Sequence, residues 1–182
     1  MNLLEEIQEV YATAECLHDN ESIELAIEQM AQAINAKLAS SNPLVLCVMN
    51  GGIVVAGKLL TQLNFPLTID AINASRYNNS TSGSTINWLV KPKTELHGRT
   101  ILLIDDILDE GITLKAIYDY CMNAGAKAVY IAALLDKQLD HPKPIAADFI
   151  GYAVPNKYLF GFGMDYKGYL RNAAGIFACK DK

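Results

Sequence analysis

Residues 101–114, with the sequence ILLIDDILDEGITL, constrain the fold of this chain more than any other stretch. The first four are apolar and include β-branched isoleucine at both ends, a pattern that predicts a buried strand. Acidic residues follow at once, and Gly111 then permits a backbone conformation that other residues avoid. From Thr113 onward the apolar residues have helical spacing. The segment therefore predicts a strand, a tight acidic turn and a helix.

The acidic turn indicates a ligand that carries both a phosphate and hydroxyl groups. Free backbone N–H groups and the positive end of a starting helix attract a phosphate. The preceding carboxylates would repel a bare phosphate, but they can accept hydrogen bonds from a sugar or hold Mg²⁺ through water. In the alternative interpretation, Asp109 and Glu110 only complement the dipole of the helix. Asp105 and Asp106 would then be solvated acids without a ligand.

The same segment closely resembles the phosphoribosyl pyrophosphate (PRPP) signature of type I phosphoribosyltransferases. That signature consists of an apolar strand, two acids, two apolar residues, Asp, a small residue, Gly, any residue and Thr. Every position agrees except Glu110, where the family usually has Thr or Ser. The signature is specific because it fixes the strand, the acids, the glycine and the threonine together. The resemblance implies a transferase that uses PRPP.

Composition and charge argue against several other classes of protein. A chain of 182 residues that is 51% hydrophobic is long enough for one domain with an ample core. A net charge of −5 and a pI near 5.1 argue against a nucleic-acid surface, which needs a basic stripe. No apolar run approaches the roughly 20 residues that span a bilayer, and the first residues lack the basic start of a secretory signal. We expect a cytoplasmic protein without nucleic-acid or membrane partners.

Strand and helix patterns alternate along the chain. The predicted elements are helices at 3–14, 23–38 and from the 50–52 turn through residue 60, strands at 44–49, 67–72, 129–134 and 149–154, and a mobile polar loop at 75–85. This alternation predicts an α/β fold with a doubly wound, mostly parallel sheet that binds ligands beyond the carboxyl ends of its strands. We expect a single domain over residues 1–182, with a core at about 40–135. A small C-terminal purine-binding hood at about 136–182 would include the N-terminal helix.

The C-terminal part looks like the purine-binding half of hypoxanthine-guanine phosphoribosyltransferases. Three segments carry the resemblance: LLDK at 134–137, PNKYLFGFGMDY at 155–166 and YLR at 169–171. Asn50-Gly51-Gly52 stands in the place of the pyrophosphate loop. The resemblance therefore runs from about residue 44 to residue 171, and the residues before it carry no matched motif. The three histidines are too scattered to be assigned a role.

The resemblance implies four contacts with the purine. Tyr158 would stack on the base, and the backbone of Leu159 would read its edge. Lys137 would donate to the 6-oxo oxygen, and because a cation offers only donors it would accept hypoxanthine or guanine and reject the amino group of adenine. Asp165 would lie near the guanine amino edge and contribute, partly through water, to Mg²⁺. Taken one at a time, the alternatives are a core tyrosine, a solvated lysine and a surface ion pair.

The resemblance also implies how PRPP is held. Asp105 and Asp106 would address the ribose hydroxyls and, through water, the metal. Asp109 would be the general base that takes the proton from purine N7 as N9 attacks the anomeric carbon. Arg171 and Mg²⁺ would neutralise the departing pyrophosphate. The residues that complete the 5′-phosphate loop would be Glu110, Gly111, Ile112 and Thr113.

Three positions depart from the family pattern. Asn50 stands where a basic residue usually precedes Gly51, although the backbone contact of that loop, often a cis non-proline peptide, can survive. Arg76 is inserted into the usual Ser-Tyr pair of the mobile loop, and we expect it to compensate partly for Asn50. A Glu110 carboxylate beside a phosphate would cost about 1–4 kcal/mol. We therefore expect it to turn out of the phosphate site toward a nearby Lys or Arg or the first turn of the helix.

These features predict a purine-salvage enzyme that transfers the phosphoribosyl group of PRPP to N9 of hypoxanthine or guanine, giving IMP or GMP and pyrophosphate with Mg²⁺. The resemblance suggests a homodimer or homotetramer. One alternative is a regulator of transcription or translation that has the same fold and binds purine or PRPP; the acidic pI and the intact Asp109 speak against it. A uracil or adenine transferase is a weaker alternative, disfavoured by Lys137 and Tyr158.

Overall fold

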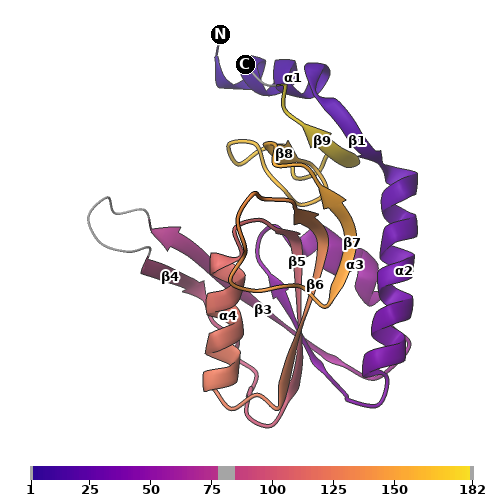
Figure 1. The fold of residues 1–182 in the computed structure, drawn as a ribbon, viewed down its shortest axis with the longest axis vertical. Coiled ribbons are helices and arrows are strands. Elements are labelled where there is room, and N and C mark those ends of the chain that lie inside the picture. The colour runs from indigo at the N-terminus through magenta and orange to yellow at the C-terminus, as the bar shows by residue number, and fades with distance from the viewer. Residues whose placement is uncertain (1, 78–84, 181–182) are drawn as a thin grey trace.

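A computed structural model describes residues 2–77 and 85–180 of the chain. The helices are α1 (Leu3–Thr13), α2 (Asn20–Leu38), α3 (Ile53–Leu60) and α4 (Ile112–Asn123). The strands are β1 (Glu15–Asp19), β2 (Leu44–Val48), β3 (Thr68–Tyr77), β4 (Thr85–Val90), β5 (Thr100–Leu108), β6 (Ala128–Lys137), β7 (Phe149–Val154), β8 (Leu159–Phe160) and β9 (Gly175–Ala178). Figure 1 shows these elements along the chain.

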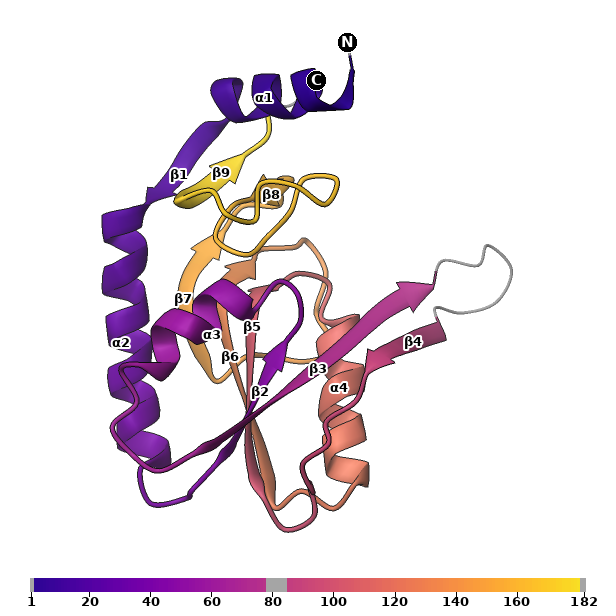
Figure 2. The same cartoon turned by 180° about the vertical axis from the view of Figure 1, so that it is seen from behind.

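The centre of the molecule is a six-stranded sheet with the order β4-β3-β2-β5-β6-β7. Only β4 runs antiparallel to its neighbour, and the other pairings are parallel. Helices α2 and α3 cover one face and α4 covers the other (Figures 1 and 2). The predicted α/β fold with a mostly parallel sheet is therefore confirmed.

The alternation of side chains along β5 explains why this strand lies in the middle of the core. Leu102 and Ile104 pack toward α2 and α3, whereas Ile101 and Leu103 pack toward α4. All four side chains are fully buried. A strand buried on both faces has a continuous apolar run instead of an alternating one, which is the pattern of residues 101–104.

Besides the end of β6, which extends to Lys137 instead of the predicted residue 134, two predicted boundaries were wrong at the carboxyl edge of the sheet. The signature strand extends to Leu108, so Asp105 and Asp106 belong to β5 and not to the turn. The polar segment expected to be a loop from residue 75 is still strand through Tyr77, because Ser75 and Arg76 pair with β4. Neighbouring strands satisfy the backbone groups in both places, whatever the polarity of the side chains. Thr85, the last residue of that predicted loop, begins β4, and residues 78–84 lie outside the described residues.

A second, antiparallel sheet with the order β1-β9-β8 joins the two ends of the chain. Glu15 pairs with Ala178, and the ring of Tyr11 in α1 contacts the ring of Phe177 at 5.3 Å between centroids. This small sheet lies with α1 beyond the carboxyl edge of the central sheet (Figure 1). In the described part of the chain, no helix has both the length and the apolar character needed to cross a membrane.

Candidate active site

A cavity of about 300 Å³ opens at the carboxyl edge of the central sheet. Its lining comes mainly from the ends of β2, β3 and β5, the first turn of α4 and the segment before β9. The lining residues include all those predicted to hold PRPP: Asn50, Gly51, Arg76, Asp105, Asp106, Asp109, Glu110, Gly111, Ile112, Thr113, Asp165 and Arg171. We call this space the first cavity.

A second cavity, of about 260 Å³, adjoins the first. It is lined by the four residues predicted to contact the purine, Lys137, Tyr158, Leu159 and Asp165. The two cavities share the lining residues Asp106, Ile107, Asp109, Asp165 and Arg171. Every residue predicted to contact PRPP, the purine or the metal therefore borders one cavity or the other.

Asp105 and Asp106 form an acidic pair at the floor of the first cavity. Asp105 Oδ1 accepts from the Asp106 N–H at 2.9 Å, and Asp106 Oδ1 accepts from the Ile107 N–H at 2.8 Å. Removal from water raises the pKa of both carboxyls, and for Asp105 the Asp106 charge adds to this rise. The positive charge of Arg171 acts on both pKa values in the opposite direction. The pair is therefore suited to a cation or to hydroxyl donors.

The donor set of this pair fits Mg²⁺ that is shared with a substrate. Within residues 2–77 and 85–180, no group of three or more His, Cys, Asp or Glu side chains is arranged to hold a metal by itself. Mg²⁺ commonly takes one or two carboxylates and completes its shell with waters and substrate phosphates. Two adjacent carboxylates that face an open cavity meet that description.

Three segments approach one another closely around Asp106. A Cβ atom on Gly51 would lie 2.3 Å from Asp106 Oδ2, and one on Gly163 would lie 2.1 Å from the Gly51 carbonyl oxygen. Arg171 Nη1 donates to the Gly163 carbonyl at 2.6 Å, and its Nη2 lies 2.5 Å from Asp165 Oδ1. The Met49–Asn50 peptide is cis, as the resemblance anticipated for this loop. Glycines at 51 and 163 thus allow the C-terminal segment to pack on the loop after β2.

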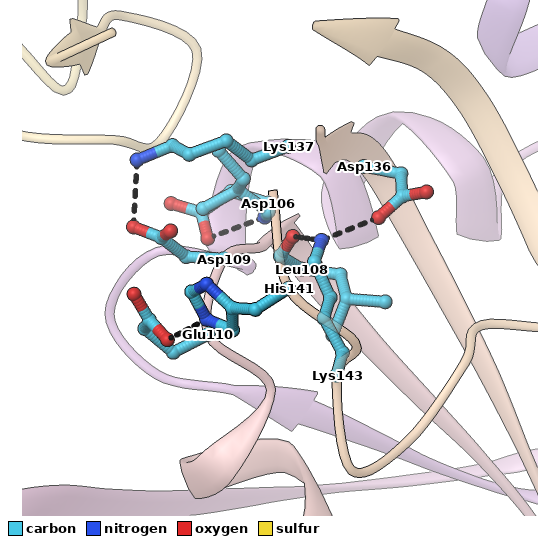
Figure 3. A network of polar contacts seen from close by, with 9 residues as sticks. Asp106, Leu108, Asp109, Glu110, Asp136, Lys137, His141 and Lys143 are labelled. Atoms are coloured by element: carbon cyan, nitrogen blue, oxygen red, sulfur yellow. Dashed lines mark hydrogen bonds and ion pairs between the residues drawn. The ribbon is translucent and has the colours of Figure 1, made fainter. Parts of the chain in front are cut away.

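Lys137 and Asp109 form an ion pair that borders the second cavity. Lys137 Nζ lies 2.7 Å from Asp109 Oδ2, and only 11% of the lysine side chain is exposed compared with 47% of the aspartate (Figure 3). The pairing of Leu108 with Asp136 in the parallel strands β5 and β6 places the next residues side by side. Register between strands therefore brings together two residues that are 28 positions apart.

Comparison with known proteins agrees with this geometry. Residues 13–167 match the model of the phosphoribosyl transferase domain. The chain is 31% identical over 167 residues to a hypoxanthine-guanine phosphoribosyltransferase of Streptococcus agalactiae, covering 91% of this chain and 93% of the relative. It is also 31% identical over 165 residues to that of Bacillus subtilis, covering 90% and 92%.

The chain belongs to the hypoxanthine-guanine phosphoribosyltransferase family. Solved structures show that the fold is shared. A hypoxanthine phosphoribosyltransferase of Staphylococcus aureus has a TM-score of 0.86 at 23% identity, with 91% of each chain covered. A hypoxanthine-guanine phosphoribosyltransferase of Bacillus anthracis has a TM-score of 0.82 at 25% identity, covering 91% of this chain and 98% of the other.

In this family member the segment between β6 and β7 contributes two residues that sequence patterns did not reveal. His141 Nε2 lies 3.1 Å from Glu110 Oε2. The prediction that Glu110 pairs with a Lys, an Arg or the first turn of the helix was therefore wrong. Lys143 Nζ donates to the Leu108 carbonyl and to Asp136 Oδ1, each at 2.6 Å. Figure 3 shows both residues beside the turn after β5. No local spacing rule links them to that turn, because the partners lie up to 35 positions away.

Proposed function

We infer that the protein salvages purines by transferring the phosphoribosyl group of PRPP to N9 of hypoxanthine or guanine, giving IMP or GMP and pyrophosphate. The observation that carries this inference is the pair of adjoining cavities, one acidic with a helix start and one with an aromatic ring and a lysine. The shared Asp109 borders both, at the place where the base would meet the sugar. Relatives that are named for hypoxanthine and guanine support the same substrates.

For PRPP, we propose that the acidic pair would bind the ribose hydroxyls and, through water, Mg²⁺, and that Asp165 would contribute to Mg²⁺, partly through water. When bound, Mg²⁺ would neutralise charge that develops on the departing pyrophosphate. The 5′-phosphate would be held by Gly111, Ile112 and Thr113, because the first turn of α4 offers N–H groups and the positive end of its dipole. Gly111 supports this geometry with a φ of 77°, which glycine adopts without strain.

For pyrophosphate, we propose contacts from Arg171, Arg76, Asn50 and Gly51. All four border the first cavity. Asn50 offers no charge there, so the two guanidinium groups would supply the cationic donors. Arg171 already faces Asp165, and a pyrophosphate would compete for that guanidinium with its greater negative charge.

For the purine, we propose that Tyr158 stacks on the ring while the Leu159 backbone and Asp165 read the edge near C2. Tyr158 is 55% exposed, as expected of an aromatic residue whose ring is accessible to a flat ligand. The Lys137 and Asp109 pair offers a donor beside an acceptor. Hypoxanthine and guanine present the complementary pattern, O6 beside N7–H, so Lys137 would bind O6 and Asp109 would take the N7 proton.

At larger scale, we propose that the chain forms one domain, with a purine-binding hood made of residues 136–182 and the N-terminal helix. We also propose that the protein is a homodimer or homotetramer and that it is located in the cytoplasm. The small sheet that joins β1 to β9 supports the hood. Exposed apolar side chains on β3 and β4 support self-association: Ile69, Leu89 and Val90. The four cysteines are free thiols, which suits a reducing compartment. Sedimentation tests the oligomeric state, and cell fractionation tests the cytoplasmic location.

The reaction is tested by incubating the protein with PRPP and Mg²⁺ and each of hypoxanthine, guanine, adenine and uracil, and by detecting nucleotide and pyrophosphate. We expect IMP and GMP, and a kcat/KM for adenine lower by about 10³-fold or more, because the adenine amino group would face the Lys137 donors. Chelation of Mg²⁺ should abolish turnover. Comparable kcat/KM for adenine and hypoxanthine would exclude the 6-oxopurine assignment, and purine binding without turnover would favour the regulator.

A further inference from the structure

Glu110 is the residue of the PRPP signature that most needs an explanation. It borders the first cavity directly before Gly111, where the proposed phosphate loop begins. Its carboxylate contacts the imidazole of His141, from the segment between β6 and β7, and not the N–H groups of the loop. The other ring nitrogen, Nδ1, lies 3.2 Å from Asp140 Oδ1 (Figure 3 shows the pair with Glu110).

We propose that His141 is a positioning residue that holds the Glu110 carboxylate away from the 5′-phosphate and offsets its charge. This proposal rests on the proposed function, because the phosphate in question is that of PRPP or the product nucleotide. It assigns a role to a residue outside the PRPP signature. It also explains how a phosphate loop can contain a carboxylate where a hydroxyl is usual.

The surrounding charges favour a protonated ring. Charged side chains that contact His141, or line the same cavity as His141, include Glu110, Asp140, Asp136, Lys137 and Lys143. Lys137 pairs with Asp109 and Lys143 pairs with Asp136, which leaves Glu110 and Asp140 as the acids that contact the ring. Hydrogen bonds to those two acids raise the pKa of His141. A protonated ring would cancel one negative charge beside a phosphate dianion.

Lys143 anchors the segment that carries the exposed His141 ring. This lysine, two residues after His141, is itself nearly buried, with 12% of its side chain accessible. It donates to the Leu108 carbonyl at the end of β5 and to Asp136 in β6. The segment is therefore bonded to the last residue of β5, directly before Asp109, and to β6, which carries Lys137, and His141 faces Glu110 from this segment.

A double-mutant cycle tests the proposal through the dissociation constants of PRPP and of IMP, measured by titration calorimetry at constant salt. The variants are His141→Ala, Glu110→Gln and the double variant. We expect His141→Ala to weaken both ligands by about two- to fivefold, the size of a partly exposed charge pair, with kcat nearly unchanged. In the Glu110→Gln background, the same change should have a clearly smaller effect, because no carboxylate remains to be held.

The pH dependence separates this role from a merely structural one. The ring is charged below its pKa, so the ratio of the His141→Ala to wild-type dissociation constants should be largest at low pH and fall toward one as the ring loses its proton. Ionisation of the phosphate changes both dissociation constants by the same factor, so it cancels in the ratio. His97→Ala is the matched control, since His97 lies on the segment before β5, at the opposite edge of the sheet, and it should show a ratio of one at every pH.

Equal weakening by His141→Ala in both backgrounds, a flat pH ratio, or no weakening in either background would each overturn the proposal. Wild-type protein that binds neither PRPP nor IMP would instead contradict the proposed function. Circular dichroism of the variants should match the wild type, because His141 is on an exposed segment between strands.

Discussion

At the scale of single residues, Asp109 and Lys137 form the central contact of the proposed active site. The 2.7 Å ion pair holds each side chain in the position from which it could meet the purine. Binding of a base would replace the pair with two new hydrogen bonds, so the free protein does not leave the poorly exposed Lys137 without a partner. The residues that would choose and deprotonate the purine therefore also stabilise each other in the free state.

Replacement of Asp109 by Asn should reduce kcat by roughly 10- to 10³-fold while PRPP binding remains similar, because the amide keeps an acceptor for Lys137 but cannot take a proton. The measurement is steady-state kinetics with hypoxanthine, combined with PRPP titration. Asp119→Asn on α4 is the control, since that carboxylate forms an exposed pair with Lys115. An unchanged kcat in Asp109→Asn would remove Asp109 from the role of base.

At the scale of elements, the segment between β6 and β7 supports the turn after β5. Lys143 makes two short hydrogen bonds, one to each strand, from a position that is almost inaccessible to solvent. Asp109 directly follows β5 and Lys137 is the last residue of β6, so the same contacts support the spacing of that pair. A connection between strands thus acts as a support for the site.

Lys143→Met should lower the free energy of unfolding by about 1–3 kcal/mol, because it keeps the length of the side chain but removes the cation that donates to the Leu108 carbonyl and to Asp136 Oδ1. Urea denaturation measures the change. Lys115→Met, which removes an exposed i,i+4 pair with Asp119, should cost no more than about 0.5 kcal/mol. Similar costs for the two variants would show that the Lys143 contacts contribute little.

At the scale of the whole molecule, glycines allow the C-terminal segment that contains Gly163 to pack closely on the loop after β2. Gly163 has a φ of 108°, and the position that a Cβ atom would occupy lies against the Gly51 carbonyl oxygen. The Gly163 N–H donates to the Arg171 carbonyl, and the Gly163 carbonyl accepts from the Arg171 guanidinium. Gly51 in turn packs on Asp106. The spacing between the acidic pair and Arg171 therefore depends on the absence of side chains at two positions.

Gly163→Ala should lower both stability and kcat/KM, since a Cβ would combine backbone strain of about 1–3 kcal/mol with a collision that moves Arg171 away from the acidic pair. Gly168→Ala provides a matched control: its φ of 85° is also positive, but nothing lies within 4 Å of the added Cβ. We expect a smaller loss of stability there. Equal effects of the two variants in urea denaturation and in kinetics would refute the close-approach argument.

Local sequence was sufficient for the features that depend on neighbouring residues. The apolar run at 101–104, the helical spacing after Gly111 and the strand at 149–154 were all predicted at their places, because side-chain burial imposes a period that the sequence carries. The PRPP signature likewise lies within one strand, turn and helix. The cavities at the carboxyl edge followed from the order of strands and helices.

Tertiary structure alone decided the features that join distant segments. Asp105 belongs to a strand because Ala133 of β6 pairs with it, and β1 exists because β9, from the other end of the chain, completes its hydrogen bonds. The contact of His141 with Glu110 has the same origin. Partners as far apart as Asp105 and Ala133, or Glu15 and Ala178, leave no periodic pattern in either segment, so their pairing is fixed only when the sheet sets the register.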